Sequence, residues 1–271
     1  MINEKTVLGK ENNGEIITLG DLQLRLKDML KDVIKVFEDN GVYYFAAEGT
    51  MLGAIRHSDM IPWDDDIDLG FKLQDYKKIV NLLTTNLDNK YDVQCFDTNN
   101  KYAVTQPMIK VRLRNTYVEY NAWYDRNNCG CNGIFIDLIA FSNCCPTNND
   151  HILRRKSYFR SILLVGLNYL KLNNITLKER HLRIAHKYNE EYKDSKMIGY
   201  ALNYIPWKKY MFSKNDFEDL IDVKFSSFTI KVPKKYDTIL RQIYGDYTKM
   251  PENNKIKLDH SKNIKLKSSG K

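Results

Sequence analysis

A mixed α/β fold, with a β-sheet core, flanking helices and a C-terminal helical portion, is the fold class that this sequence predicts. Apolar residues recur with a helical period from Leu19 to Asp39, and Gly41 follows as a stop signal. Short apolar runs typical of buried strands then alternate with helical segments up to about Cys145. From Asp150 onwards the pattern is mainly helical. With 271 residues, the chain can bury a substantial core.

The predicted elements follow one another without an internal repeat or a low-complexity segment. Residues 143–149 are the one candidate seam, and they are typical of a loop and not of a linker. We expect helices at residues 19–39, 50–56, 75–87, 150–172, 177–192, 196–204 and 235–244. Strands are expected at residues 42–47, 66–72, 91–96, 108–113, 134–141 and 228–232.

The overall composition argues against several classes of protein. The net charge is +8, from 42 basic and 34 acidic residues, but the basic residues are scattered, so no nucleic-acid partner is predicted. The longest aliphatic run, Ile162–Val165, is far shorter than the roughly 20 residues that span a bilayer. The polar start, Met1–Glu15, has no signal-peptide core, and five cysteines in such a chain favour a reducing compartment. We therefore expect a cytoplasmic protein, whose oligomeric state the sequence does not predict.

The last residues, 251–271, form a basic tail with six lysines against one glutamate and one aspartate. One interpretation is a solvated, partly frayed terminus. The alternative is weak attraction to an anionic membrane surface or to a charged glycan-lipid acceptor, which would place the protein peripherally at the inner membrane face.

Three aspartates spaced two residues apart are the most informative feature of the chain. Asp64, Asp66 and Asp68 lie in the stretch 63–72, and if that stretch is extended their carboxylates share one face. Closely packed like charges repel, and a hard divalent cation with oxygen ligands offsets the repulsion. We therefore predict a metal site with Asp66 and Asp68 as ligands. Asp64 would be an outer ligand or a site-shaping carboxylate, while Asp65 should face away as a cap or surface contact.

A small-residue turn lies just before these aspartates. The apolar run Val42–Ala47 leads to Gly49 and Thr50, and a short helical pattern, Met51–Arg56, follows. A strand, a turn and a helix N-terminus together present backbone N–H groups to an anion. We predict that Gly49 and Thr50 bind phosphate of the substrate through backbone amides and the threonine hydroxyl. Next to the metal carboxylates, this arrangement suggests metal-assisted phosphoryl or nucleotidyl transfer.

A further aspartate, Asp137, lies within the apolar strand candidate Ile134–Phe141. A carboxylate is costly to bury there unless it is paired or bound to a metal. One interpretation is a salt bridge to an arginine. The other is a catalytic role, as a metal ligand or as the acceptor of a proton from an attacking hydroxyl.

Several cations are candidates for binding an anionic substrate. Arg56 and His57 end the short helix, where the backbone dipole also favours cations for structural reasons. Arg56 lies close enough in sequence to the acidic stretch to hold a donor phosphate with its planar fork. Lys110, Arg112 and Arg114 alternate along one strand and share a face, which is either solvent or an anion-binding wall.

Two other metal sites fit parts of the pattern. The aspartates match the first ligands of an EF-hand calcium loop, with Asp75 at the twelfth position, but Leu69 occupies the sixth, where glycine is required. The pairs Cys129/Cys131 and Cys144/Cys145 offer four thiolates for zinc. However, the predicted strand between the pairs spans about 30 Å and should hold them apart. We therefore favour the aspartate site over both.

The stretch 49–69, G-T-M-L-G-A-I-R-H-S-D-M-I-P-W-D-D-D-I-D-L, resembles the signature of the LicD family, part of the nucleotidyltransferase-fold superfamily. That superfamily has a strand ending in Gly-Ser or Gly-Thr, an acidic-x-acidic strand, and a third acidic residue on a later strand. The matching residues are Gly49-Thr50, Asp66-Ile67-Asp68 and Asp137. A second family-like block comprises V-P-K-K-Y at 232–236 and I-Y-G-D-Y at 243–247. The similarity covers residues 18–250, with a catalytic core to about 145, and leaves 1–17 as an N-terminal segment and 251–271 as the tail.

The resemblance implies a nucleotidyltransferase-type mixed sheet and a transferase of phospho-alcohols. Its cargo would most often be phosphocholine, moved from a CDP-linked donor such as CDP-choline to a glycan hydroxyl with release of CMP. One or two Mg²⁺ ions, with Mn²⁺ as the alternative, would be held by Asp66, Asp68 and Asp137. The acceptor would be a glycan or glycolipid precursor of lipopolysaccharide, teichoic acid or capsule. Two alternatives stay open: an enzyme of the same fold that uses CDP-glycerol, CDP-ribitol or an NTP, and a non-catalytic nucleotide- or glycan-binding protein.

Overall fold

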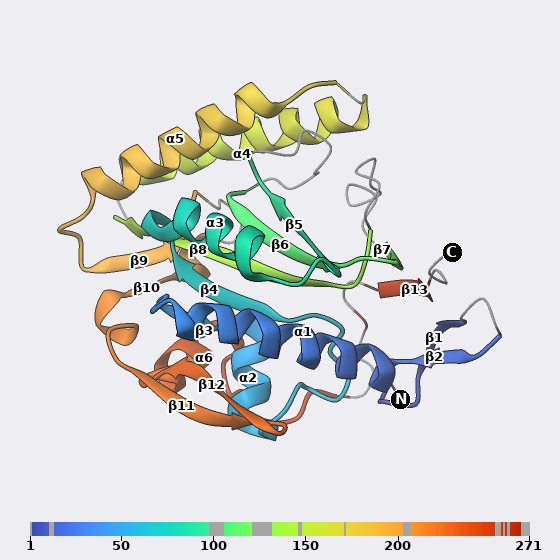
Figure 1. The fold of residues 1–271 in the computed structure, drawn as a ribbon. Helices are drawn as coiled ribbons and strands as arrows, with labels where there is room; N and C mark the ends of the chain where they lie inside the picture. The colour runs from blue at the N-terminus through green and yellow to red at the C-terminus, as the bar shows by residue number, and fades with distance from the viewer. Residues whose placement is uncertain are drawn as a thin grey trace.

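The computed structural model describes residues 2–10, 14–97, 106–120, 132–145, 148–170, 172–202, 207–252, 256, 258 and 261–266. Its architecture is mixed α/β around a seven-stranded mixed sheet, which confirms the predicted fold class (Figure 1). The helices are α1 (Leu19–Asp39), α2 (Glu48–His57), α3 (Tyr76–Asn86), α4 (Asn148–Tyr169), α5 (Ile175–Glu191) and α6 (Tyr236–Tyr244). The central strands are β3 (Tyr44–Ala46), β4 (Asp68–Lys72), β5 (Tyr91–Cys95), β6 (Met108–Leu113), β8 (Phe135–Cys144), β9 (Met197–Tyr200) and β10 (Met211–Ser213).

The central sheet places the acidic strand β4 directly beside the strand that carries Asp137. β4 pairs antiparallel with β3 and parallel with β8. On its other edge, β8 pairs first with β6 and then with β9, both antiparallel. β5 extends the sheet beyond β6, and β10 extends it beyond β9. Because β4 and β8 are neighbours, two stretches about seventy residues apart meet at one point of the sheet.

The long helix α1 begins and ends at the predicted residues. Thr18 caps it: the threonine hydroxyl accepts the N–H of Asp21, and the carboxylate of Asp21 accepts the N–H of Thr18. The buried stripe of α1 includes Leu22, Leu26 and Val33, and the helix contacts β8 and α3. Its amphipathic pattern and its cap therefore agree on the same helix.

The helices lie on both sides of the central sheet. In Figure 1, α4 and α5 run together along one side, and α5 contacts β8. On the opposite side lie α2, α6 and a hairpin of β11 (Leu220–Phe225) and β12 (Phe228–Pro233) (Figure 1). α2 contacts β3, β4, β11 and α6, so the helix that follows the Gly-Thr turn is held from several directions.

Several parts of the chain differ from the sequence predictions, among them the strands Thr116–Tyr120, Met211–Ser213 and Leu220–Phe225, where no element was expected. Residues 196–204 were expected to be helical, but Met197–Tyr200 form strand β9. This strand is stabilised by pairing with β8 and β10, and at Gly199 an added Cβ would lie 2.5 Å from the carbonyl oxygen of Tyr210. Such a close approach between strands depends on tertiary contacts, which a local helical pattern does not report.

The described part of the tail includes a β-strand, which differs from the interpretation of the tail as a frayed terminus. β13 (Ser261–Leu266) lies between β1 (Val7–Lys10) and β7 (Thr116–Tyr120), and β2 (Ile16–Thr18) pairs with β1. These strands form a second, four-stranded sheet at the right of Figure 1. The N-terminal segment and the tail therefore pair with each other at this sheet.

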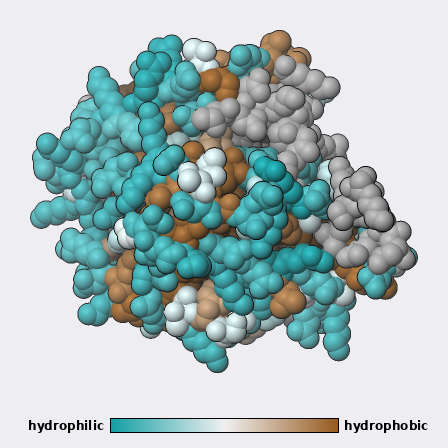
Figure 2. All heavy atoms as spheres, viewed as in Figure 1, coloured by the Kyte–Doolittle hydropathy of each residue, from teal (hydrophilic) through white to brown (hydrophobic). Residues whose placement is uncertain are grey.

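The surface seen in Figure 2 is largely hydrophilic, with apolar residues in separate patches. Among the described helices, none combines the length and the apolar run that a bilayer-crossing helix needs. The proposed attraction of the tail to an anionic membrane stays a prediction.

Candidate active site

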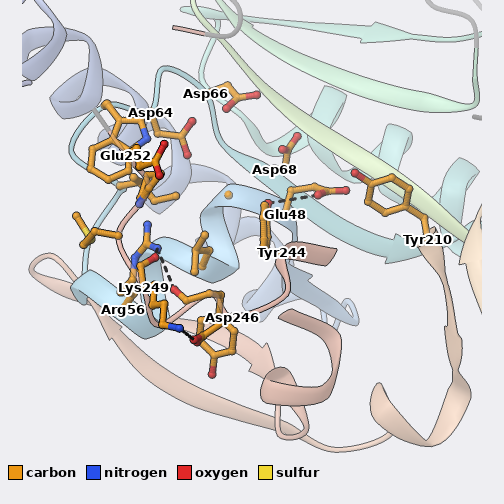
Figure 3. Close-up of a pocket in the computed structure, with 17 residues that line it drawn as sticks. Glu48, Arg56, Asp64, Asp66, Asp68, Tyr210, Tyr244, Asp246, Lys249 and Glu252 are labelled. Carbon is orange, nitrogen blue, oxygen red and sulfur yellow. Dashed lines mark hydrogen bonds and ion pairs between the residues drawn. The ribbon is translucent and has the colours of Figure 1, made fainter. Parts of the chain in front are cut away.

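A pocket of about 810 Å³ lies beside the first residue of β4. Its volume falls within the range of small-molecule binding sites. Three parts of the chain form its walls, namely α2, residues 61–68, and residues 244–252 from the end of α6 onwards, with Tyr210 at one side (Figure 3).

The three aspartates Asp64, Asp66 and Asp68 all line this pocket (Figure 3). β4 begins at Asp68, two residues later than expected. The three aspartates are half-buried, whereas the residues between and after them are buried. This burial pattern agrees with a shared face for Asp64, Asp66 and Asp68, but the carboxylate of Asp65 does not follow the predicted alternation. The side chain of Gln23 on α1 fixes the approach to the strand, because its amide donates to the carbonyl oxygens of Ile61 (3.0 Å) and Asp64 (2.9 Å).

A carboxylate cluster suited to a divalent ion precedes the strand. Carboxylate oxygens of Asp64, Asp65 and Asp66 lie within 4.8 Å of one another. An all-oxygen donor set fits hard cations such as Mg²⁺ or Mn²⁺. Asp65 was expected to be a cap or surface contact facing away, but it is 3% exposed and its carboxylate joins the cluster. Asp65 precedes strand β4, which begins at Asp68. The alternation of side chains along a strand therefore does not separate its carboxylate from those of Asp64 and Asp66.

Asp137 lies next to Asp68 in the sheet. The two residues are partners in the parallel register of β4 and β8, so their side chains share a face. However, Asp137 is not among the described residues that line the pocket. It is 7% exposed, and its Oδ2 accepts a hydrogen bond from Nζ of Lys110 at 2.7 Å. The buried ion pair expected as the structural alternative is therefore present, with a lysine in place of an arginine.

The cationic side chains of Lys110 and Arg112 on β6 bind buried partners within the protein. Lys110 pairs with Asp137, and the guanidinium of Arg112, which is 1% exposed, donates to Gln94 Oε1 (2.7 Å) and to the carbonyl of Gly133 (2.9 Å). The prediction that this face is solvent or an anion-binding wall is wrong for both residues. Arg114 lies 3.9 Å from Asp92.

The Gly-Thr pair lies within the first turn of α2, because the helix begins at Glu48 and not at Thr50. Gly49 lines the pocket, where the N-terminal dipole of α2 favours an anion. Thr50 is 3% exposed and is not among the described residues of the pocket wall. Its hydroxyl accepts the backbone N–H of Asp68 at 2.8 Å, so it holds the first residue of β4 against α2.

Gly49 is required for a close approach to an aspartate. A Cβ added there would lie 2.6 Å from Oδ2 of Asp64. We expect Gly49→Ala to displace this carboxylate without unfolding the protein, because the clash is with the end of a side chain. Activity and Mg²⁺ affinity should fall about 10–100-fold, the usual effect of disturbing a group around a metal site.

The matched control is Gly166→Ala in α4, where nothing lies within 4 Å of an added Cβ. This control should stabilise the helix slightly and leave activity unchanged. Enzyme assays and thermal melts of both variants check the prediction, and full activity of Gly49→Ala would contradict it.

The hydroxyl of Thr50 is expected to contribute to stability. Thr50→Val keeps the shape of the side chain but leaves the N–H of Asp68 without its acceptor, which costs about 1–3 kcal/mol. Thr50→Ser keeps the acceptor and should be close to wild type. Denaturant unfolding measures both changes. A Thr50→Val variant with wild-type stability but weaker donor binding would instead favour the predicted role in phosphate binding.

Arg56 lines the pocket and joins the two family-like blocks. Its Nη1 donates to the carbonyl oxygens of Tyr247 (3.0 Å) and Lys249 (3.5 Å), and its guanidinium lies 5.9 Å from the ring of Trp63. Partial burial lowers the pKa of Arg56. Arg56 therefore positions residues 247–249 as a wall of the pocket, and its predicted contact with donor phosphate stays a prediction.

Sequence reasoning missed Glu48 as a pocket residue. It has a left-handed backbone with φ of 45°, an uncommon conformation that clusters at functional sites. Burial raises the pKa of Glu48 to about 7; the nearby Asp66 raises it further, whereas Lys209 opposes the shift. An acidic residue immediately before Gly49-Thr50 was the only local signal for it.

The second family-like block was also not assigned a role from sequence. Tyr244, Asp246 and Tyr247 line the pocket, and Asp246 forms an ion pair with Lys249 at 3.0 Å (Figure 3). This wall depends on contacts such as Arg56 to Tyr247, which lie 191 residues apart in sequence. The spacing of the block by itself does not predict such contacts.

The structure excludes one of the two alternative metal sites, the EF-hand calcium loop, and does not test the other, the zinc site. The EF-hand hypothesis is excluded, because Asp68–Lys72 are paired in the sheet on both edges and do not form a calcium loop between two helices. Cys144 is buried at the end of β8, and Cys144 and Cys145 form no disulfide. Cys129 and Cys131 lie outside the described residues, so the zinc hypothesis is not tested.

The fold and the pocket define an α/β protein in which clustered carboxylates and a helix N-terminus face the same cavity. Its sequence matches a model of the LicD/FKTN/FKRP nucleotidyltransferase domain over residues 41–178. The chain therefore belongs to the LicD family, as the motifs predicted.

Named relatives differ in how much of the chain they cover. The chain is 26% identical to the lipopolysaccharide cholinephosphotransferase LicD of Haemophilus influenzae over 264 residues, which cover 90% of this chain and 96% of that protein. It is 31% identical to the ribitol 5-phosphate transferase FKRP of Mus musculus over 115 residues, 41% of this chain and 23% of that protein. The ribitol-5-phosphate transferase FKTN of Mus musculus is 42% identical over 53 residues, covering 20% of this chain and 12% of that protein.

Proposed function

We propose that this protein transfers a phospho-alcohol from a CDP-linked donor to a hydroxyl of a cell-surface glycan precursor, with release of CMP. The preferred phospho-alcohol is phosphocholine. The observation that carries the proposal is the pocket, in which Asp64, Asp66 and Asp68 face the N-terminal turn of α2. Carboxylates for a cation and helix amides for an anion are the two features that binding of a metal–diphosphate complex needs.

Phosphocholine is preferred over other cargoes because of how the relatives align. The relative named as a cholinephosphotransferase aligns over almost its whole length, whereas the ribitol-phosphate transferases align over a quarter of their length or less. The alternatives are CDP-glycerol, CDP-ribitol or an NTP as donor. Lipopolysaccharide precursors are one acceptor class; teichoic acid and capsule precursors are the others.

Residues in and beside the pocket have proposed roles in binding the metal, the donor or the attacking hydroxyl. Asp66 and Asp68, with Asp64 and Asp65 beside them, would hold Mg²⁺ or Mn²⁺, and Asp137 would complete this set. A bound divalent ion neutralises charge on the donor diphosphate and on the departing CMP. Gly49 and the first amides of α2 would bind donor phosphate, and Arg56 in the last turn of the same helix would support it. Asp137 would accept the proton of the attacking hydroxyl if its carboxylate turns away from Lys110.

A donor panel tests the proposal. The protein is incubated with Mg²⁺, a glycan acceptor extract and one of CDP-choline, CDP-glycerol, CDP-ribitol or an NTP, and CMP or pyrophosphate is measured together with the mass of the product. We expect CMP only with CDP-linked donors, a mass increase of phosphocholine on the acceptor, and no release in EDTA. Pyrophosphate from an NTP would favour nucleotidyl transfer, and no Mg²⁺-dependent turnover or binding with any donor would favour a non-catalytic protein.

A further inference from the structure

One wall of the pocket combines a carboxylate with two tyrosine rings. Glu48 is the first residue of α2, Tyr244 is the last residue of α6, and Tyr210 ends a short 3₁₀ helix, Trp207–Tyr210. The hydroxyl of Tyr244 donates to Oε2 of Glu48 at 3.5 Å. In Figure 3, Glu48 lies between the two tyrosines, and the hydroxyl of Tyr210 is directed towards it. We call Glu48, Tyr210 and Tyr244 the tyrosine–glutamate wall.

The two rings already hold a cation. Nζ of Lys209 lies 5.6 Å from the centre of the Tyr210 ring and 5.9 Å from the centre of the Tyr244 ring. Both distances are within the range of cation–π attraction. Tyr210 is fixed in its plane because it stacks on Tyr200, with 4.7 Å between ring centres and 16° between planes. Lys209 itself is exposed, so its flexible side chain can leave this position for solvent.

The electrostatic setting favours a positive ligand. Apart from Glu48, five of the described acidic residues line the pocket: Asp64, Asp66 and Asp68, which the proposed metal would neutralise, Asp246, which pairs with Lys249, and Glu252. In Figure 3, Asp68 lies between Glu48 on one side and Asp64 and Asp66 on the other. The carboxylate of Glu48 can therefore bind a cation other than the proposed metal. The left-handed backbone of Glu48 is a further sign of a functional position.

We propose that the tyrosine–glutamate wall is the subsite for the transferred alcohol and that it selects an alcohol with a positively charged end. When no donor is bound, the ammonium of Lys209 occupies the position of that cation. The inference rests on the proposed function, because a CDP-linked donor would carry the cation into the pocket. A quaternary ammonium suits the wall best: it cannot donate hydrogen bonds, and it gains from ring faces and a carboxylate together. A neutral polyol such as glycerol or ribitol leaves the charge of Glu48 unbalanced.

Calorimetric titrations in Mg²⁺ without acceptor test the inference. CDP-choline, CDP-glycerol, CDP-ribitol and CDP are titrated into the wild-type protein and its variants. CDP-choline should bind about tenfold more tightly than CDP-glycerol. Glu48→Gln and Tyr244→Leu should each reduce the ratio of the two affinities to less than about threefold, because CDP-choline loses a partner for its cation and CDP-glycerol has no cation to lose.

Three further variants separate the subsite from a structural role. Tyr244→Phe keeps the ring and should keep the choline preference. Lys209→Ala removes the competing ammonium and should increase that preference. Tyr158→Leu is the matched control, since Tyr158 on α4 is 38% exposed and Tyr244 is 40% exposed, and it should change nothing.

The outcomes are distinct. Equal affinities of the wild type for CDP-choline and CDP-glycerol, or a choline preference that survives both Glu48→Gln and Tyr244→Leu, would overturn the inference. If those results occur while CMP is still released from CDP-linked donors, the proposed function stands without this subsite. If no CDP compound binds, the proposed function itself fails.

Discussion

Replacing Asp66 or Asp68 by asparagine is expected to lower donor turnover by at least about 10³-fold while the protein stays folded. Asparagine keeps the size of the side chain but removes the negative charge that a divalent ion requires. Both aspartates are half-buried at the pocket surface, so neither is part of the apolar core. The rate of CMP release and thermal melting curves measure the two parts of the prediction.

The control for these variants is Asp194→Asn. Asp194 is exposed and lies outside the pocket, so the same loss of charge should leave turnover unchanged. Turnover close to wild type in either Asp66→Asn or Asp68→Asn would contradict the assignment of the metal site.

The second large effect is expected at the ion pair beside the pocket. The side chains of Lys110 and Asp137 are only 7% and 10% exposed, and Lys110 Nζ also lies 3.6 Å from the centre of the Phe135 ring. Lys110→Met leaves the carboxylate of Asp137 buried without its cation, which should lower the free energy of unfolding by about 3–5 kcal/mol. Denaturant unfolding in EDTA measures this loss.

Added Mg²⁺ distinguishes the two roles of Asp137. If Asp137 belongs to the metal site, Mg²⁺ should stabilise Lys110→Met more than the wild type, because the released carboxylate becomes a ligand and binding to the folded state adds stability. The double variant Lys110→Met with Asp137→Leu removes both charges, should recover much of the lost stability, and should lose the extra Mg²⁺ effect. The same Mg²⁺ stabilisation in the wild type and in Lys110→Met would show Asp137 to be only structural.

Much of the fold was predictable where local signals agree. α1 matches its predicted bounds because its apolar stripe, the cap at Thr18 and the stop at Gly41 point to the same helix. β6 matches residues 108–113, and α6 differs from its prediction by one residue. β9 was missed because its pairing with β8 and β10 is non-local.

The site was predictable in part for the same reason. The spacing of Asp64, Asp66 and Asp68 predicted one shared face, and all three line the pocket; the position of the Asp65 carboxylate beside them was not predicted. The partner of Asp137 was not predictable as Lys110, since the register of β6 against β8 decides it. The wall formed by residues 244–252 depends on Arg56, and the sequence carries no local signal for that contact.

The central claim is that the aspartate pocket binds a divalent ion together with the diphosphate of the donor. The most direct test is the anomalous scattering of Mn²⁺ in crystals of the protein grown with CDP. The account predicts a Mn²⁺ peak within coordination distance of carboxylate oxygens of Asp66 and Asp68, with the CDP diphosphate beside it at Gly49. Ordered Mn²⁺ found only elsewhere, or CDP bound with its diphosphate outside this pocket, would contradict it.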